Sequence, residues 1–156
     1  MFVFNFKPLK HKKLLVIVTA AVALTALLCV FIAVKGNQKP PKTAQSTTGV
    51  CYDTSVENDG YASFFAQLDI EAENEPLKSR EVVIPEEFNQ TYDDYNALQK
   101  HAGLDLTRFK GCTAQELTFA LKNGKEPFAV LLTTDDRVIG GHLTNGEYGS
   151  EMLPLI

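Results

Sequence analysis

Histidine and cysteine, two side chains often used in catalysis and metal binding, are scattered along this 156-residue sequence: His11, Cys29, Cys51, His101, Cys112 and His142. No two of them have the spacing of a zinc site or of a thiol nucleophile with its base. Motifs that bind phosphate groups or nucleotides are absent as well. The sequence therefore predicts no catalytic residue, no metal site and no cofactor.

Two acidic pairs and one glycine pair remain as candidate binding features. Asp93-Asp94 fall on the solvent side of a predicted helix and Asp135-Asp136 in a predicted turn, where carboxylates are usually solvated. Calcium, the alternative, needs several oxygens that converge on one point. Gly140-Gly141 interrupt a predicted strand, which favours a close backbone approach or a bulge over a cradle for a ligand.

One amide, Gln99, lies where an apolar side chain would be expected. The residues that share its helical face are Phe88, Tyr92, Tyr95, Leu98 and Ala102. A buried amide without partners costs roughly 1–3 kcal/mol, so Gln99 must find partners inside the fold. We expect Gln99 and Asn96 to clamp the loop at 104–110, or an edge strand, against the helix. The alternative is that these two amides contribute to a ligand groove.

Charge is distributed unevenly along the chain. Residues 1–50 contain seven lysines and no acidic residue, whereas residues 51–156 contain eight basic and nineteen acidic residues, a balance of −11. An acidic body argues against nucleic acid as a partner, because phosphates require a basic surface. It is compatible with a soluble domain held away from an anionic membrane surface.

An uncharged apolar segment, residues 14–34, has the length of a transmembrane helix. Helical geometry gives it a length of about 31 Å, which matches a hydrocarbon core of roughly 30 Å. We expect it to span the lipid bilayer of the cell membrane, with the basic residues 1–13 in the cytoplasm and the rest of the chain outside. A cleaved signal peptide and a lipoprotein anchored at Cys29 are the alternatives. The sequence favours an uncleaved anchor, because no good cleavage site follows and Leu28 precedes the cysteine.

The next segment, residues 35–50, is rich in proline, glycine, serine, threonine and glutamine. Because so few of its side chains are apolar, burial cannot offset the entropy of ordering it, and we expect a flexible linker. The folded domain is then expected over residues 51–156.

Periodicity within 51–156 predicts an α+β domain. A capping box at 54–57 indicates a first helix, and residues 69–73 and 79–85 are typical of short strands. A second helix is expected from Pro85 to Ala102, with Gly103 as its left-handed stop. Alternating apolar residues after Thr113 predict three antiparallel strands. The expected fold is two helices packed on an antiparallel sheet that ends in a three-stranded meander.

A set of residues along the body resembles the domain of unknown function family numbered 4830. They are Glu81 to Phe88, Tyr92, Tyr95-Asn96, Leu98-Gln99, Gly103, Asp105-Leu106, Lys110-Gly111 and Ile139 to Gly141. The resemblance covers roughly residues 55–145 and departs from the family at Asp69 and His142. It implies an anchored or exported protein of a Gram-positive bacterium and supplies no mechanism.

These observations predict a single-pass membrane protein with an extracytoplasmic binding or sensing module, whose partner is a protein or ligand of the cell envelope. The alternative is a cell-envelope hydrolase with a carboxylate site that the sequence does not reveal. A domain used only for assembly is a third interpretation. A cleft with two facing carboxylates, or with a thiol beside a histidine, would favour the hydrolase.

We predict that the full-length chain fractionates with membranes, because residues 14–34 are long and uncharged. Fractionation of the expressing cells, followed by N-terminal sequencing, measures this. A mature protein in the culture medium that begins near Asn37 would contradict an uncleaved anchor.

Overall fold

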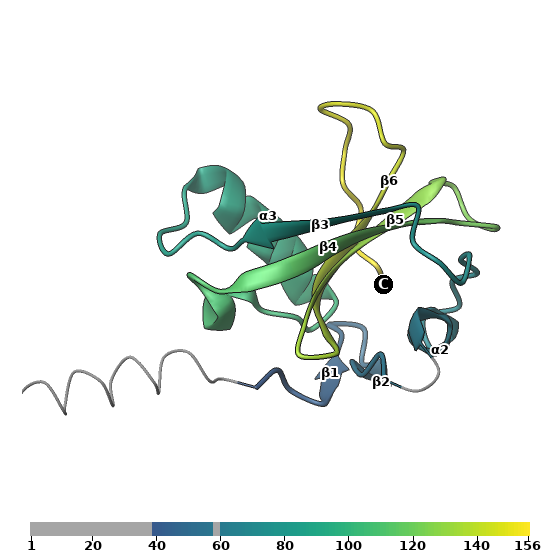
Figure 1. Cartoon of the computed structure of the whole chain (residues 1–156), viewed down its shortest axis with the longest axis horizontal. Helices are drawn as coiled ribbons and strands as arrows, with labels where there is room; N and C mark the ends of the chain where they lie inside the picture. The colour runs from purple at the N-terminus through teal and green to yellow at the C-terminus, as the bar shows by residue number, and fades with distance from the viewer. Residues whose placement is uncertain (1–38, 58–59) are drawn as a thin grey trace, which may run out of the picture. The chain divides into compact units, whose positions relative to one another are not determined.

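The computed structural model describes residues 39–57 and 60–156, and the predicted membrane segment 14–34 lies outside them (Figure 1). The elements are β1 (Thr43–Gln45), β2 (Cys51–Asp53), α2 (Gly60–Ala66), β3 (Lys78–Val83), α3 (Gln90–His101), the 3-10 helix η1 (Leu106–Phe109), β4 (Thr113–Ala120), β5 (Phe128–Thr134) and β6 (Arg137–Thr144). The predicted α+β class is confirmed. Within the two described ranges, no helix is long and apolar enough to cross a membrane.

Four strands form an antiparallel sheet in the order β3-β4-β5-β6, and β1 pairs separately with β2. The predicted three-stranded meander is β4, β5 and β6. Its tightest connection is the two-residue turn at Asp135 and Asp136, whose φ angles are 50° and 55°. Two positive φ angles in succession give a turn that matches the twist of a hairpin, and aspartate tolerates this region better than most residues.

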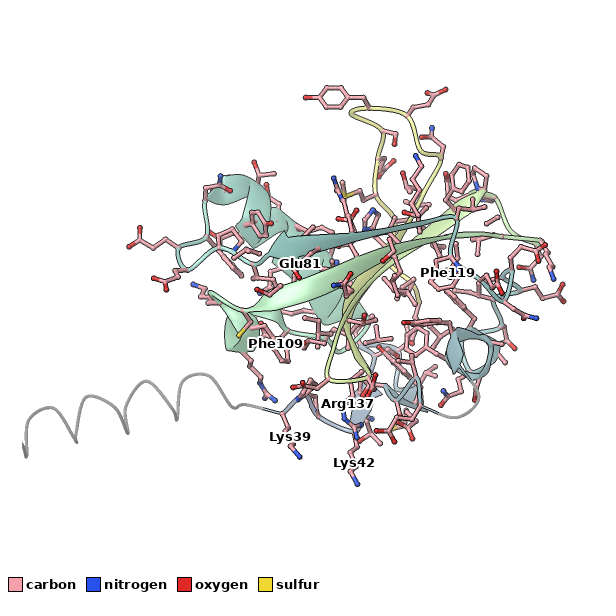
Figure 2. The ribbon with its side chains drawn as sticks, in the orientation of Figure 1. Lys39, Lys42, Glu81, Phe109, Phe119 and Arg137 are labelled. Carbon is pink, nitrogen blue, oxygen red and sulfur yellow. The ribbon has the colours of Figure 1, made fainter. Side chains whose placement is uncertain are left out.

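The two faces of the sheet carry separate hydrophobic clusters. On the α2 face, Phe119 packs against Phe65 of α2, with ring centroids 5.2 Å apart. On the α3 face, Leu132 and Ile139 belong to a cluster that includes Phe109 of η1. Phe119 and Phe109 are both labelled in Figure 2. The sheet is therefore the middle layer, and α3 and η1 cover only part of one face.

A bulge in β6 decides which side chains face α3. Leu132 pairs with Gly140 but Thr133 pairs with Val138, so Ile139 is an extra residue in β6. Since one extra residue exchanges the faces of all that follow, the bulge moves His142 from the α2 face to the α3 face. The predicted bulge or close approach at the glycine pair is confirmed. A Cβ on Gly141 would lie 2.8 Å from Leu155 Cδ1.

The outer edge of β6 is closed by three different segments. The N–H of Val138 donates to the Thr54 carbonyl (2.8 Å), and that of Leu143 donates to the Leu153 carbonyl (2.9 Å). Between them, the N–H of Gly141 donates to Gln99 Oε1 at 2.6 Å. A side chain of α3 thus replaces a neighbouring strand in the middle of this edge.

Helix α3 starts later than the sequence indicates. Asn89, not Pro85, precedes the helix, and its side chain accepts a hydrogen bond from Tyr92 N–H at 3.0 Å. Ile84 is still tied to the sheet side, because its N–H donates to the Cys112 carbonyl at 2.9 Å. The expected stop is confirmed, since Gly103 has φ +78° directly after the C-cap.

The predicted flexible linker, residues 35–50, is wrong for its second half. Residues 43–45 form β1, and Ala44 and Ser46 are buried. The N–H of Thr47 donates to the carbonyl of His101, the last residue of α3, and the hydroxyl of Tyr52 donates to that of the C-cap residue Ala102 (2.9 and 2.6 Å). Main-chain pairing and helix capping therefore order a segment whose composition offers little apolar burial. The compact unit begins at Lys39 instead of Cys51.

The first half of the body also differs from its prediction. The capping-box residue Thr54 is buried at the end of β2, where its hydroxyl donates to the Pro41 carbonyl at 2.6 Å. The described part of the first helix is Gly60–Ala66. Residues 69–73 form a single bridge, Ala72 with Leu121, instead of a strand. Long-range pairing has overridden the local signals there.

Gln99→Ala should lower the free energy of unfolding by roughly 1–3 kcal/mol, because it leaves the Gly141 N–H buried without an acceptor. The melting temperature of a domain of this size should fall by about 4–20 °C. Gln90→Ala is the matched control on the same helix, because Gln90 is exposed, and it should change stability by less than about 0.5 kcal/mol. Thermal melting of residues 39–156 measures both. Equal melting temperatures for the Gln99 variant and the parent would show that this amide does not hold the fold.

Candidate functional site

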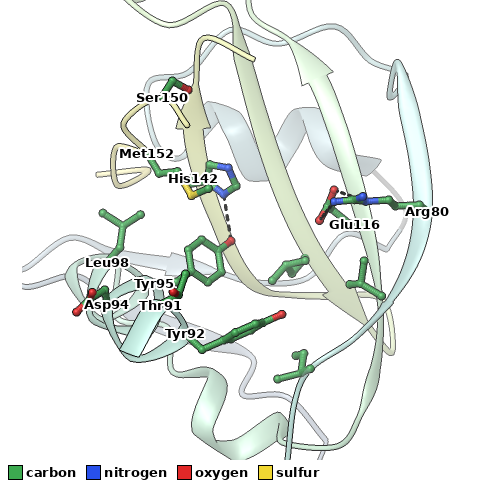
Figure 3. Close-up of a pocket in the computed structure, with 13 residues that line it drawn as sticks. Arg80, Thr91, Tyr92, Asp94, Tyr95, Leu98, Glu116, His142, Ser150 and Met152 are labelled. Carbon is green, nitrogen blue, oxygen red and sulfur yellow. Dashed lines mark hydrogen bonds and ion pairs between the residues drawn. The ribbon is translucent and has the colours of Figure 1, made fainter. Parts of the chain in front are cut away.

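A groove of about 540 Å³ lies between α3 and the α3 face of the sheet (Figure 3). Its lining comes from β3 to β6, from α3 and from the C-terminal segment: Arg80, Val82, Ile84, Thr91, Tyr92, Asp94, Tyr95, Leu98, Glu116, Leu132, His142, Ser150 and Met152. Seven of these thirteen side chains are apolar or aromatic, and six are polar or charged. A concave site of this size and composition is typical of ligand pockets.

The groove exists because α3 lies close to β6 and leaves β3 and β4 uncovered. Gly140 permits the approach, since a Cβ there would lie 3.2 Å from Leu106 Cδ2 and 3.3 Å from Gln99 Oε1. Antiparallel sheets twist, so strands at the far edge turn away from a helix that is held against the near edge. Figure 3 shows α3 and β3 on opposite sides of the groove.

An aromatic ladder begins at Phe88, just before α3, and continues on the helix with Tyr92 and Tyr95, which form one wall of the groove. The ring of Tyr92 is 5.4 Å from that of Phe88 and 6.5 Å from that of Tyr95, measured between centroids. Lys110 Nζ lies 4.3 Å from the Phe88 centroid, a cation–π contact at the end of the ladder. Tilted and edge-to-face rings at helical spacing give a packed apolar surface.

Tyr95 and His142 form a polar pair within the groove. The Tyr95 hydroxyl and His142 Nδ1 are 3.0 Å apart and share one hydrogen bond. Burial raises the pKa of Tyr95, as do the charges of Glu116 and Tyr92. Burial lowers the pKa of His142, although the charge of Glu116 works in the opposite direction. Both groups are therefore neutral at neutral pH, and the imidazole has one nitrogen left for a further hydrogen bond.

An ion pair, Arg80 with Glu116, lies on the sheet side of the groove. The two residues are directly opposite each other in β3 and β4. Arg80 Nε and Nη2 donate to Glu116 Oε1 and Oε2 at 2.7 and 2.9 Å, a bidentate arrangement. The Arg80 side chain is 71% exposed, so the pair contributes little to stability and mainly orients the carboxylate.

The family model for the domain of unknown function DUF4830 matches residues 64–143. The chain belongs to this family. No curated protein and no solved structure matches the chain. The DUF4830 region runs from α2 to β6, so it contains α3, the sheet and most of the groove lining. The hairpin β1-β2 and the groove residues Ser150 and Met152 lie outside it.

Within the DUF4830 region, the two amides singled out by sequence have internal partners and do not line the groove. Gln99 is fully buried and accepts from Gly141 of the edge strand β6, while its Nε2 has no partner. Asn96 holds the loop instead, because its Oδ1 accepts from Leu106 N–H (2.8 Å) and its Nδ2 donates to Asp105 (3.1 Å). The clamp is thus divided between two residues, one for the strand and one for the loop.

The groove residues Glu116 and His142 were missed by sequence reasoning. Glu116 alternates with apolar residues in its strand and therefore resembles a solvent-facing side chain. The meander register without a bulge would place His142 on the α2 face, opposite Ala129, and not beside Tyr95. The only signal was the glycine pair, which pointed to an irregularity but not to its consequence for His142.

The other candidate residues stay apart from the groove or from each other. Cys51 and Cys112 are free thiols, and neither lines the groove. Asp94 accepts from Gln90 on its own helix at 2.9 Å. In the described part of the chain, no three histidine, cysteine or acidic side chains come together in a way that could hold a metal ion.

The lowered pKa of His142 predicts a loss of stability in mild acid. An unfolded histidine has a pKa of about 6.5, so below this value the unfolded state takes up a proton that buried His142 resists. Stability is therefore retained above that pH and falls as pH decreases toward the folded pKa. Melting temperatures measured from pH 7 to pH 5 should fall more steeply for the parent than for His142→Gln. Parallel curves would mean that His142 does not titrate differently on folding.

Proposed function

We propose that this protein is a single-pass membrane protein whose extracytoplasmic domain binds a ligand in the groove between α3 and the sheet. The observation that carries the proposal is the groove itself, with a rigid apolar wall and two fixed polar points. The uncharged segment 14–34 and the basic residues before it support the anchor and its orientation. The acidic body supports a soluble domain outside the membrane.

The arrangement of polar groups supports binding over the hydrolase alternative. Both oxygens of Glu116 are engaged by Arg80, and the second groove carboxylate, Asp94, bonds to its own helix. Figure 3 shows Asp94 and Glu116 on opposite sides, with Tyr95 between them. Glycoside hydrolysis, the common two-carboxylate mechanism, needs two such groups that flank the scissile bond with no side chain between them. The free thiols do not line the groove that holds His142.

The groove favours a ligand with an apolar part and one or two hydrogen-bonding groups. The apolar part would lie against Tyr92, Leu98 and Leu132, where burial contributes most of the affinity. The free nitrogen of His142 and the Arg80–Glu116 pair on the sheet side would fix its orientation. Because the walls are held by the ladder and the clamp, little ordering is needed on binding.

The proposal predicts that filling the groove abolishes binding of an apolar probe. Val82 lines the groove, whereas its neighbour Val83 is 61% exposed and outside the groove lining. Val82→Trp should therefore weaken binding of the neutral dye N-phenyl-1-naphthylamine to residues 39–156 at least tenfold. Val83→Trp adds the same side chain to the same strand. Because successive residues of a strand face opposite sides of the sheet, it should leave the affinity unchanged within about twofold.

Dye fluorescence titrations of the parent and both variants measure this, with melting curves to confirm that each variant is folded. Equal affinity of the two variants would place the dye elsewhere and contradict the groove as the binding site. Absence of dye binding to the parent would contradict an open apolar groove.

A further inference from the structure

Strand β3 has an open outer edge. It is hydrogen-bonded to β4 alone, in an unbroken register from Lys78↔Thr118 to Val83↔Thr113. Among residues 39–57 and 60–156, no other segment donates to or accepts from its outer side. Five of its six residues are exposed. The contrast with β6, whose edge is closed at three points, makes β3 the place where this sheet can accept another strand.

The hydrogen-bond pattern decides which groups of β3 face outward. Ile84 N–H donates to the Cys112 carbonyl, and in an antiparallel ladder such bonded pairs alternate with pairs that do not bond each other. The even-numbered residues of β3 therefore bond to β4. The N–H and C=O groups of Ser79, Glu81 and Val83 point away from the sheet and are free for a further strand.

The groove side of β3 is basic, although the body is acidic. Lys78, Arg80 and Val82 alternate along this side, and the last two line the groove. Arg80 gives Nε and Nη2 to Glu116, while its Nη1 makes no hydrogen bond within the described residues. A strand added at this edge would extend the floor of the groove. Its side chains on that face would lie beside Lys78, Arg80 and Val82. Charge complementarity requires acidic and apolar side chains at matching alternate positions.

A second copy of the chain is disfavoured at this edge in the two registers that centre the pair on β3. Residues that oppose each other across a ladder lie on the same face, so a two-fold pair centred on β3 places Arg80 against Arg80 or Glu81 against Glu81. Like charges directly opposite each other destabilise a strand pair. A segment with acidic side chains opposite Lys78 and Arg80 would avoid this repulsion. The charges of the edge therefore favour another polypeptide over a second copy of this chain.

We propose that β3 docks an extended segment of another polypeptide, which adds as an antiparallel fifth strand. The segment carries an apolar side chain beside Val82 and acidic side chains beside Arg80 and Lys78. Read from its N-terminus, it has an apolar residue followed by acidic residues two and four positions later. This inference rests on the proposed binding function. It adds that the ligand is a polypeptide and that the main chain of β3 binds it.

The direct test uses a capped seven-residue peptide with valine at position two, glutamate at positions four and six, and threonine elsewhere. A labelled form is titrated with the full-length chain in neutral detergent, and fluorescence anisotropy reports binding. A matched peptide with lysine in place of both glutamates should bind at least tenfold more weakly. Equal affinity of the two peptides, or no binding of the glutamate peptide, would overturn the proposal.

Two variants separate the main-chain contact from the charges. Glu81→Pro removes an outward N–H without removing a bond to β4, and it should weaken binding at least tenfold. Glu81→Thr retains the N–H and should bind as the parent does, within about threefold. Undiminished binding by a folded Glu81→Pro variant would contradict strand addition.

The second variant exchanges a charge, so this test does not require the strand to fold with a proline at position 81. Lys78→Glu, at an exposed position, should weaken binding of the glutamate peptide. A peptide with lysine at position six alone should restore it, because position six lies opposite residue 78. Failure of this exchange would overturn the register. The dye experiment with Val82→Trp and Val83→Trp does not involve the main-chain edge of β3. A failure of the peptide experiments would therefore overturn strand addition without changing the dye result for the groove.

Discussion

The hydrogen bond from Gly141 N–H to Gln99 Oε1 determines how α3 meets the sheet. It requires Gly140, because a side chain there would crowd the amide, and it requires the bulge at Ile139, which gives Gly140 and Gly141 their positions. With this contact in place, α3 is held over β6 and the opposite half of the same face stays uncovered. The closure of the middle of the β6 edge and the open groove are thus two consequences of one contact.

The two edges of the sheet are treated in opposite ways. At β6, Thr54, Gln99 and Leu153 supply acceptors to successive outward N–H groups. At β3, the described residues supply none, and charged side chains occupy the strand. Open edges expose a protein to unwanted pairing, and the like-charge contacts of a self-paired β3 limit that risk. An edge that disfavours its own copy but borders an apolar groove is well suited to selective binding of an extended chain.

Much of the fold could be predicted from local patterns. Alternating apolar residues and turn residues predicted the meander, and Gly103 predicted the end of α3. The position of Gln99 on an apolar helical face predicted a clamp. Those signals are local, since each depends on residues within one or two elements. The hairpin of β1 and β2 has no such local signal. It is ordered by pairing between its own strands and by a main-chain hydrogen bond to the end of α3, about fifty residues away.

The site was harder to predict than the fold. Tyr95 and His142 are 47 residues apart, and one inserted residue in β6 decides whether they meet. No periodicity in the sequence reports a bulge, so the register that it predicts places His142 on the wrong face. Glu116 likewise acquires its partner only when β3 pairs with β4.

Amide hydrogen exchange of residues 39–156 tests most directly whether a side chain closes one edge while the other stays open. The account predicts that the Gly141 N–H, although it points outward from an edge strand, is protected to nearly the level of global unfolding. The outward N–H groups of Ser79, Glu81 and Val83 should exchange at close to the rate of an unprotected chain. Exchange of Gly141 as fast as that of Glu81 would contradict the account.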